Sequence, residues 1–347
     1  MGEYPTRLPH RRNRASGNEA TTSPARERWP GARNYAALDL GTNNCRLLIA
    51  RPANDGFTVV DAFSRIVRLG EGLASSGHLS EAAIDRTIAA LRVCSDKLRR
   101  RRVSLARSVA TEACRRASNG RAFIERVQRE TGIRLDIITA EEEARLAVLG
   151  CHALLEAGKG PALVFDIGGG STELVLIDAG DPVPGVLDWH SAPWGVVSLT
   201  EATRAAGGMD GTAECYRWMK DQVADAMRPF AARLPEVAAG RRLLGTSGTV
   251  TTLASVHLGL SVYDRSRIDG LIIPAPAMRQ VSNDLARMDL ATRSAVPCVG
   301  RERADLVVAG CAILETILDL WPAERIGVAD RGIREGILRR LMHGVGL

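Results

Sequence analysis

Asp166-Ile167-Gly168-Gly169-Gly170-Ser171-Thr172-Glu173 lies between two short apolar runs, residues 162–165 and 174–177. The runs are partly β-branched and bounded by Gly and Pro, which predicts two antiparallel strands joined by a glycine-rich turn. Because glycine has no Cβ, several backbone N–H groups of such a turn can point at one anionic oxygen. The acid at its start would repel a phosphate, so we expect it to hold a divalent cation or a water. A hairpin turn with a capping aspartate is the structural alternative.

A second stretch repeats this pattern 127 residues upstream of Asp166. The apolar residues 35–38 lead into Asp39-Leu40-Gly41-Thr42-Asn43-Asn44, and a second apolar run follows at residues 47–50. Two matching hairpins so far apart predict a duplicated domain whose halves face each other across a cleft, with one Asp pointing in from each half.

A third stretch rich in glycine and hydroxyl groups runs from Gly245 to Thr252, between the apolar pair at residues 243–244 and a segment of helical character. Backbone N–H groups and the helix dipole favour anions at a helix N-terminus. The stretch is therefore interpreted as another loop that faces phosphate.

Six motifs occur in the order Asp39–Asn43 with Arg46, Thr111–Asn119, Glu142–Leu146, Asp166–Glu173, Gly245–Thr249 and Arg334–Gly336. In this order they resemble the exopolyphosphatase and guanosine pentaphosphate phosphohydrolase family, a branch of the actin-like ATPase superfamily. The resemblance covers about residues 34–340. Six ordered motifs make it specific, whereas each motif alone is a weak signal.

The resemblance implies an α/β protein made of duplicated actin-like, ribonuclease H-like domains, each with a mixed five-stranded sheet flanked by helices and with the active cleft between them. Residues 34–150 would form the N-terminal domain and residues 151–347 the C-terminal domain, whose last segment can add a helix to the first. Longer family members append a helical, metal-dependent phosphohydrolase module. Because the six histidines have no metal-binding spacing, we expect a short two-domain member.

The resemblance also implies roles for individual residues. Glu143 would orient and deprotonate the attacking water, Arg115 would bind the substrate phosphate, and Asp166 with Glu143 would handle Mg²⁺. A structural alternative exists for the acids at residues 141–143, because they lie in the first turn of a helix that Thr139 can cap. The phosphate-binding residues would be Asp39, Gly41, Thr42, Asn43 and Arg46 on one side, and Gly168, Gly169, Gly170, Ser171, Gly245, Ser247 and Gly248 on the other.

The implied activity is hydrolysis of terminal phosphoanhydride bonds of inorganic polyphosphate with Mg²⁺. Three alternatives stay open at this point: hydrolysis of guanosine pentaphosphate, an actin-like kinase, and a noncatalytic sensor of polyphosphate or alarmone. The chemistry of the first two is related, because both need cations on the phosphate oxygens and a group placed in line with the reacting bond.

Composition limits partners and location. Of the net charge of +6, the seven arginines and three glutamates of residues 1–33 supply +4, so the charge lies mainly in a tail whose composition predicts disorder. Basic runs lack interleaved aromatics, so no dedicated nucleic-acid binding is expected. The seven scattered cysteines suit reduced cytosolic thiols, and no apolar run approaches the about 18 residues of a membrane span. We therefore expect a cytoplasmic enzyme, and a homodimer by family analogy.

Overall fold

The structure is a computed structural model that describes residues 33–343 except 55, 180–183, 209–211 and 236–239. The described residues from Arg33 onward belong to one compact unit. The predicted disordered tail, residues 1–33, lies outside the described residues apart from Arg33 itself. None of the described helices is long and apolar enough to cross a membrane.

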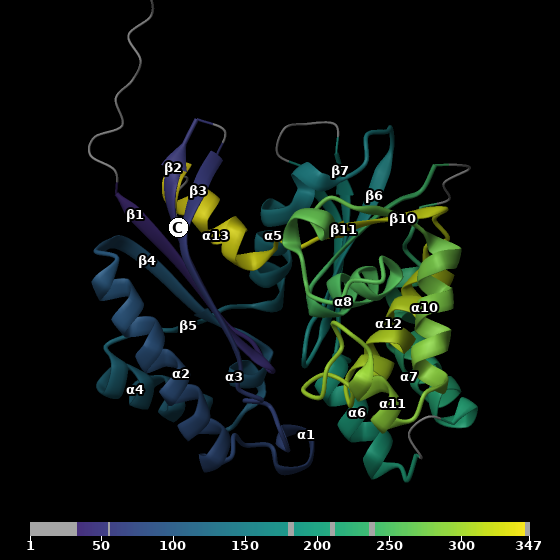
Figure 1. Cartoon of the computed structure of the whole chain (residues 1–347), viewed down its shortest axis with the longest axis horizontal. Helices are drawn as coiled ribbons and strands as arrows, with labels where there is room; N and C mark the ends of the chain where they lie inside the picture. Colours follow the sequence, from purple (N-terminus) through teal and green to yellow (C-terminus); the bar gives the residue numbers. More distant parts are fainter. Residues whose placement is uncertain (1–32, 55, 180–183, 209–211, 236–239, 344–347) are drawn as a thin grey trace, which may run out of the picture. The chain divides into compact units, whose positions relative to one another are not determined.

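The first sheet has five strands in the order β3-β2-β1-β4-β5 (Figure 1). β1 pairs antiparallel with β2 and parallel with β4, and β2 pairs antiparallel with β3. β4 and β5 are parallel. The strands are β1 (Asn34–Leu40), β2 (Asn44–Ala53), β3 (Gly56–Ile66), β4 (Val103–Ala110) and β5 (Asp136–Ile137).

The second sheet repeats this order and adds a strand. Its order β8-β7-β6-β9-β11 follows the same antiparallel and parallel pairings, and β10 joins the outer edge of β11. The expectation of five strands in each sheet is therefore wrong for this one, because Ile272 and Ile273 pair antiparallel with β11. Its strands are β6 (Pro161–Ile167), β7 (Thr172–Asp178), β8 (Gly185–Ala192), β9 (Arg242–Thr246), β10 (Ile272–Pro274) and β11 (Arg325–Ala329).

The duplicated hairpins predicted from the sequence are confirmed in backbone detail. In the first, Gly41 N donates to Asn44 O at 2.9 Å, and in the second, Gly168 N donates to Ser171 O at 3.0 Å. The two aspartates occupy the same register, because Asp39 pairs with Arg46 and Asp166 pairs with Glu173. Each sheet therefore ends its central strand with an acid that leads into a turn of the same design.

Helices cover both faces of each sheet (Figure 1), and several of them begin at a side chain that caps the first turn. Thr139 Oγ1 accepts from Glu142 N at 3.1 Å, as the sequence predicts for the start of α5. The helices are α1 (Leu73–Ser76), α2 (Glu81–Arg100), α3 (Glu112–Arg116), α4 (Gly120–Thr131), α5 (Ala140–Cys151), α6 (Val196–Ala205), α7 (Ala213–Ala231), α8 (Gly248–His257), α9 (Arg265–Ile268), α10 (Ala275–Arg287), α11 (Leu290–Ala295), α12 (Val307–Leu320) and α13 (Ile333–His343), with a 3₁₀ turn at His152–Leu154.

α5 and α13 lie between the two sheets (Figure 1). Leu146 of α5 packs in a core with Ala37 of β1 and Ile337 of α13, whereas Val148 of α5 packs in a core with Val164 of β6. α13 thus covers the first sheet although it comes from the C-terminal end of the chain. We call the first sheet with α2, α3 and α4 the first lobe, and the second sheet with α6, α7, α8, α10 and α12 the second lobe. The domain boundary at residue 150 stays a prediction.

The contact of α13 with α5 gives a stability test. A Cβ on Gly336 would overlap the carbonyl oxygen of Leu146, which is backbone and cannot rotate away. We expect Gly336→Ala to lower the free energy of unfolding by about 1–3 kcal/mol, the usual range for overpacking. Gly185→Ala is the control, because a Cβ there meets no atom within 4 Å. Equal effects of the two substitutions in denaturant titrations would contradict this account of the helix contact.

Candidate active site

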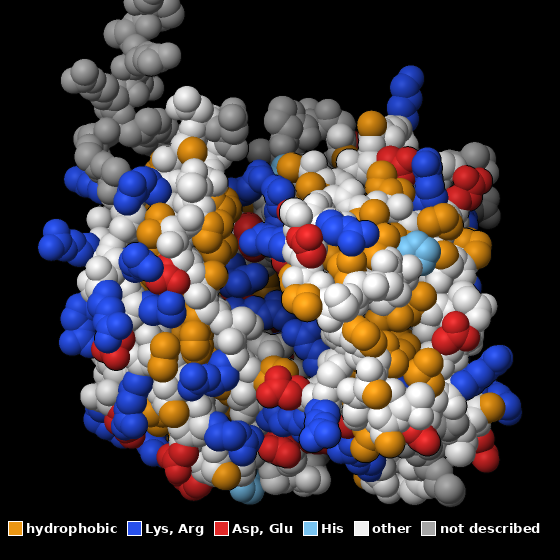
Figure 2. Space-filling view, in the orientation of Figure 1, with side chains coloured by type: hydrophobic (Ala, Val, Ile, Leu, Met, Phe, Trp, Pro, Cys, Tyr) orange, Lys and Arg blue, Asp and Glu red, His pale blue; other side chains and the backbone are white. Residues whose placement is uncertain are grey.

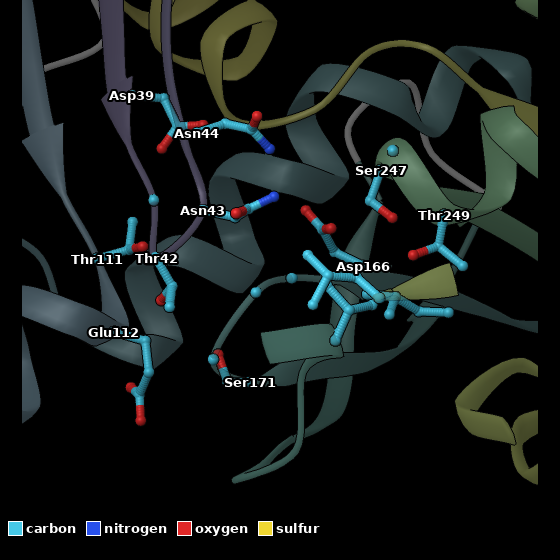
Figure 3. Close-up of a pocket in the computed structure, with 18 of the residues that line it drawn as sticks. Asp39, Thr42, Asn43, Asn44, Thr111, Glu112, Asp166, Ser171, Ser247 and Thr249 are labelled. Carbon is cyan, nitrogen blue, oxygen red and sulfur yellow. The ribbon is translucent and has the colours of Figure 1, made fainter. Parts of the chain in front are cut away.

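A cavity with a volume of about 120 Å³ lies between the two lobes. Lys and Arg side chains gather along the hollow that leads to it (Figure 2). Figure 3 shows the first lobe contributing Asp39, Thr42, Asn43 and Glu112, and the second contributing Asp166, Ser171, Ser247 and Thr249. Of the predicted site residues, the cavity is lined by Asp39, Gly41, Thr42, Asn43, Arg46, Glu143, Asp166, Gly168, Gly169, Gly170, Ser171, Ser247 and Gly248.

The two predicted phosphate turns touch each other at this cavity. A Cβ on Gly169 would lie 2.9 Å from Thr42 Cβ and 3.1 Å from Asn43 N, and a Cβ on Gly170 would lie 2.8 Å from Thr42 Oγ1. Such distances are shorter than side chains tolerate, so only glycine allows the turns to approach this closely. The glycines that the sequence assigned to phosphate binding therefore also have a packing role between the lobes.

Several buried polar atoms of the cavity have no hydrogen-bond partner among the described residues. They are Asp39 Oδ1, Asn43 Oδ1 and Ser247 Oγ. Buried polar atoms are nearly always paired in proteins, so unpaired ones that share a cavity indicate a polar ligand. Ser247 also has a positive φ of 98°, an uncommon conformation for a residue with a side chain and one that occurs often at functional sites.

Two arginines from opposite lobes approach the N-terminus of α8. Arg46 Nη2 lies 3.5 Å, and Arg303 Nη1 3.9 Å, from the position that a Cβ on Gly248 would occupy. Arg303 also donates to Thr252 Oγ1 at 2.9 Å and lines the cavity. Guanidinium groups and a helix N-terminus both favour phosphate oxygens, so the cavity combines three elements that attract a phosphate.

Four of the carboxylates that line the cavity, Asp39, Glu143, Asp166 and Glu173, have a raised pKa. Withdrawal from solvent is the main cause, and it raises the pKa of Asp166 to about 6 and that of Glu173 to about 7. For Glu143, burial and then the charge of Glu173 raise the pKa well above its usual value, against the influence of Arg115. Burial likewise raises the pKa of Asp39, although Arg46 lowers it. Mutual repulsion among these acids favours a bound cation.

The acids suit a magnesium ion that also binds water and substrate better than they suit a metal ion held entirely by protein ligands. Among the described residues, no group of three or more His, Cys, Asp or Glu is arranged to hold a metal. Mg²⁺ usually keeps several waters and takes one or two carboxylates plus substrate phosphates, so it does not need such a group. The unpaired Asp39 Oδ1 and the carboxylate of Asp166, which face the same cavity, match this mode of binding.

Arg115 and Gly245 are the two predicted site residues that do not line the cavity. Arg115 Nη2 donates to Glu112 Oε2 at 2.5 Å, and its Nη1 donates to Glu143 Oε2 at 3.2 Å. Arg115 thus contacts the predicted base rather than open space. A Cβ on Gly245 would overlap the ring of Phe165, so this glycine packs against the core of the second sheet. Substrate contact by either residue stays a prediction.

Three charged residues of the cavity, Glu112, Glu173 and Arg303, were not among the site residues predicted from the sequence. Glu173 is 2% exposed and accepts at Oε1 from Ser171 Oγ at 2.7 Å and from Ser191 Oγ at 2.9 Å. Its place between the glycine turn and the apolar run 174–177 was a usable signal for it. Glu112 begins α3, two positions after β4 ends, and could have been suspected in the same way. Arg303 lies in a charged segment that looks like ordinary surface.

Comparison with known proteins decides the family. The model of the Ppx/GppA phosphatase family matches residues 48–344. The chain belongs to this family. Its relatives include Exopolyphosphatase 2 of Mycobacterium tuberculosis, which is 30% identical over 317 residues, or 87% of this chain and 96% of that protein.

Solved structures of Ppx/GppA proteins have the same fold. The family member from Aquifex aeolicus is 28% identical, with a TM-score of 0.73 over 91% of this chain and 99% of that one. An exopolyphosphatase from Cytophaga hutchinsonii is 24% identical, with a TM-score of 0.81 over 90% of this chain and 99% of that one. The predicted family and the predicted actin-like α/β fold are therefore confirmed.

The raised pKa values predict a particular pH dependence of stability. The pKa of Glu173 in the folded protein, about 7, exceeds its ordinary value of 4.5, so the folded state binds this proton more tightly than the unfolded state. The resulting stability is present below pH 4.5 and is lost as the pH rises through about 7. Without divalent cations, the unfolding free energy of Glu173→Gln should therefore decrease less between pH 4.5 and about 7 than that of the wild type. An unchanged pH profile in denaturant titrations would contradict the raised pKa.

Proposed function

We propose that this protein is an exopolyphosphatase that releases terminal phosphate from inorganic polyphosphate. The observation that supports this most directly is the cavity in which unpaired polar atoms, two arginines and the buried Glu143 meet between the lobes. The family membership and the exopolyphosphatase relatives support the same reaction class. A polyphosphate end carries the charge density that this set of groups would bind.

The residues suggest how the chain would perform the hydrolysis. The amides of the Thr42–Asn43 turn and the N-terminus of α8 would bind the terminal phosphoryl group, and Arg46 would neutralise its oxygens. Glu143 would accept a proton from the water that attacks in line with the breaking bond. A base works best with a pKa near the working pH, and the raised pKa of Glu143 moves it in that direction.

Arg115 would act on the base. Its guanidinium contacts Glu143 and Glu112 together, and it donates from Nη1 to Ile138 O at 2.8 Å. These contacts hold the Glu143 carboxylate at the N-terminal end of α5. We therefore propose that Arg115 positions the base in addition to any contact with phosphate.

We further propose Mg²⁺ as the cofactor, held by Asp39 and Asp166, with Glu143 close by. When bound, the ion would supply positive charge to the phosphate oxygens as negative charge develops on them. Asp166 would also ionise more readily, because a neighbouring cation offsets its desolvation. A cytoplasmic location and a homodimer are proposals that rest on the cysteine pattern and on family analogy.

The role of Glu143 is tested by Glu143→Gln. We expect phosphate release from long-chain polyphosphate with Mg²⁺ to fall on the order of 10² to 10⁴ in rate, because the amide cannot accept the proton. Glu141→Gln is the matched control, since Glu141 is an exposed neighbour in the same helix turn that pairs with Arg145. Turnover of Glu143→Gln within a few-fold of the wild type would contradict the role. A parallel assay with guanosine pentaphosphate separates the two substrates of the family.

Magnesium binding is tested without activity. Because the cation favours ionised carboxylates, we expect Mg²⁺ to raise the melting temperature more at pH 8 than at pH 5.5. Asp166→Asn should remove most of this gain. Asp188→Asn serves as the control, because Asp188 pairs with Arg233 and does not line the cavity. A gain that is independent of pH and of Asp166 would show that the ion binds elsewhere.

A further inference from the structure

Residues 67–72 follow β3 and run beside the phosphate turn of the first lobe; we call them the latch loop. The amides of Val67 and Arg68 both donate to Asn43 O, at 2.9 and 3.0 Å. Gly70 N donates to Thr42 O at 2.9 Å. The latch loop is thus tied by backbone hydrogen bonds to the two residues whose other groups face the cavity. Movement of the latch loop would therefore displace the Thr42–Asn43 turn, and movement of the turn would displace the loop.

The latch loop also reaches the second lobe. Arg68 donates to both carboxylate oxygens of Asp305, at 3.2 and 3.3 Å, and to Glu302 O at 3.2 Å. A separate hydrogen bond joins Gly72 N to Glu201 Oε1 of α6 at 2.8 Å. The side chain of Asp305 is only 16% exposed, and that of Arg68 is 33% exposed. Partial burial and bidentate geometry make this pair stronger than an ordinary surface ion pair.

The backbone of Arg68 is held in an unfavourable conformation. Its φ is +47°, in the left-handed region that residues with a Cβ rarely adopt. Arg86 of α2 supports the conformation, because Nε donates to Val67 O at 3.1 Å and Nη2 donates to Arg68 O at 3.3 Å. Strained backbone of this kind persists only where surrounding contacts enforce it, and it occurs preferentially at clamps and switches.

The partner of Arg68 is close in sequence to a cavity residue. Asp305 lies two positions after Arg303, which lines the active-site cavity and donates to Thr252. Leu306, the next residue, lines the cavity as well. Hydrogen bonds therefore run from the phosphate turn of the first lobe through Arg68 to Asp305, and Asp305 lies in the same short chain segment as Arg303.

We propose that Arg68 and Asp305 form a latch between the lobes that couples closure of the cleft to the placement of Arg303. The pair can form only when the lobes lie this close, so it favours the closed arrangement. A phosphate bound by both the Thr42–Asn43 turn and Arg303 favours the same closed arrangement. The ion pair and phosphate binding therefore act on one equilibrium, between the open and the closed cleft, and each strengthens the other. Arg68 and Asp305 are positioning residues, since neither lines the cavity. The substrate part of this inference rests on the proposed function.

The first test is kinetic. Without the latch, substrate binding must also drive closure, so we expect Arg68→Ala and Asp305→Ala each to raise KM for long-chain polyphosphate about tenfold, with a smaller change in kcat. The double variant should be no worse than either single one, because all three lack the same contact. Arg68→Asp with Asp305→Arg should recover part of the loss. Additive effects, or a fall in kcat with constant KM, would overturn the latch.

The matched control is Arg233→Ala. Arg233 also makes a bidentate contact with an aspartate, Asp188, but within the second lobe and away from the cavity. We expect KM to change by less than about twofold in this variant. A tenfold effect here too would show that loss of any Arg–Asp pair has this result, and would overturn the assignment.

The second test needs no turnover and so separates failure of the latch from failure of the proposed function. Hydrogen exchange of the full-length protein should show faster exchange in residues 67–72 and also in residues 301–306 for Arg68→Ala, but not for Arg233→Ala. Faster exchange in the latch loop alone would show that Arg68 supports only its own lobe, and would overturn the coupling. If wild-type protein releases no phosphate from polyphosphate, the proposed function fails, whereas the exchange result still decides the latch.

Discussion

The close contact between the Gly169–Gly170 turn and the Thr42–Asn43 turn is the constraint on which the cleft depends. Any Cβ on these glycines would lie within 3 Å of the opposite turn, so larger residues would force the lobes apart. The contact brings the ends of two central strands together, and Asp39 and Asp166 with them. Their withdrawal from water, which raises both pKa values, is a consequence of this approach.

The two hairpins have the same backbone design but carry side chains of opposite charge at one equivalent position. Arg46 and Glu173 occupy equivalent positions, each paired in register with the aspartate of its own hairpin. The first lobe therefore presents a cation beside its aspartate and the second presents another acid. Placed face to face, the duplicated elements form one asymmetric cavity in which a phosphate and the proposed metal ion would have different neighbours.

α5 connects this cavity to the cores of both sheets. Its Leu146 packs toward the first sheet and its Val148 toward the second, while its first turn carries Glu143 into the cavity. The proposed base, at the end of such a helix, cannot move without disturbing two cores. Contacts at the opposite rim, between Arg68 and Asp305, are exposed in part and more easily broken. The cleft is thus firmly packed along one side and held by polar contacts along the other.

The sequence by itself determined the family, the repeated hairpins and most of the cavity, because turn glycines, capping residues and apolar runs act over a few neighbouring positions. Only the tertiary structure decided that Arg115 contacts Glu143, that Gly245 packs on Phe165, and that Glu173 and Arg303 face the cavity. It also added β10 to the second sheet. These features depend on which segments meet after folding. Ion pairs and strand pairs between residues far apart in the chain produce no repeating pattern in the sequence from which they could be predicted.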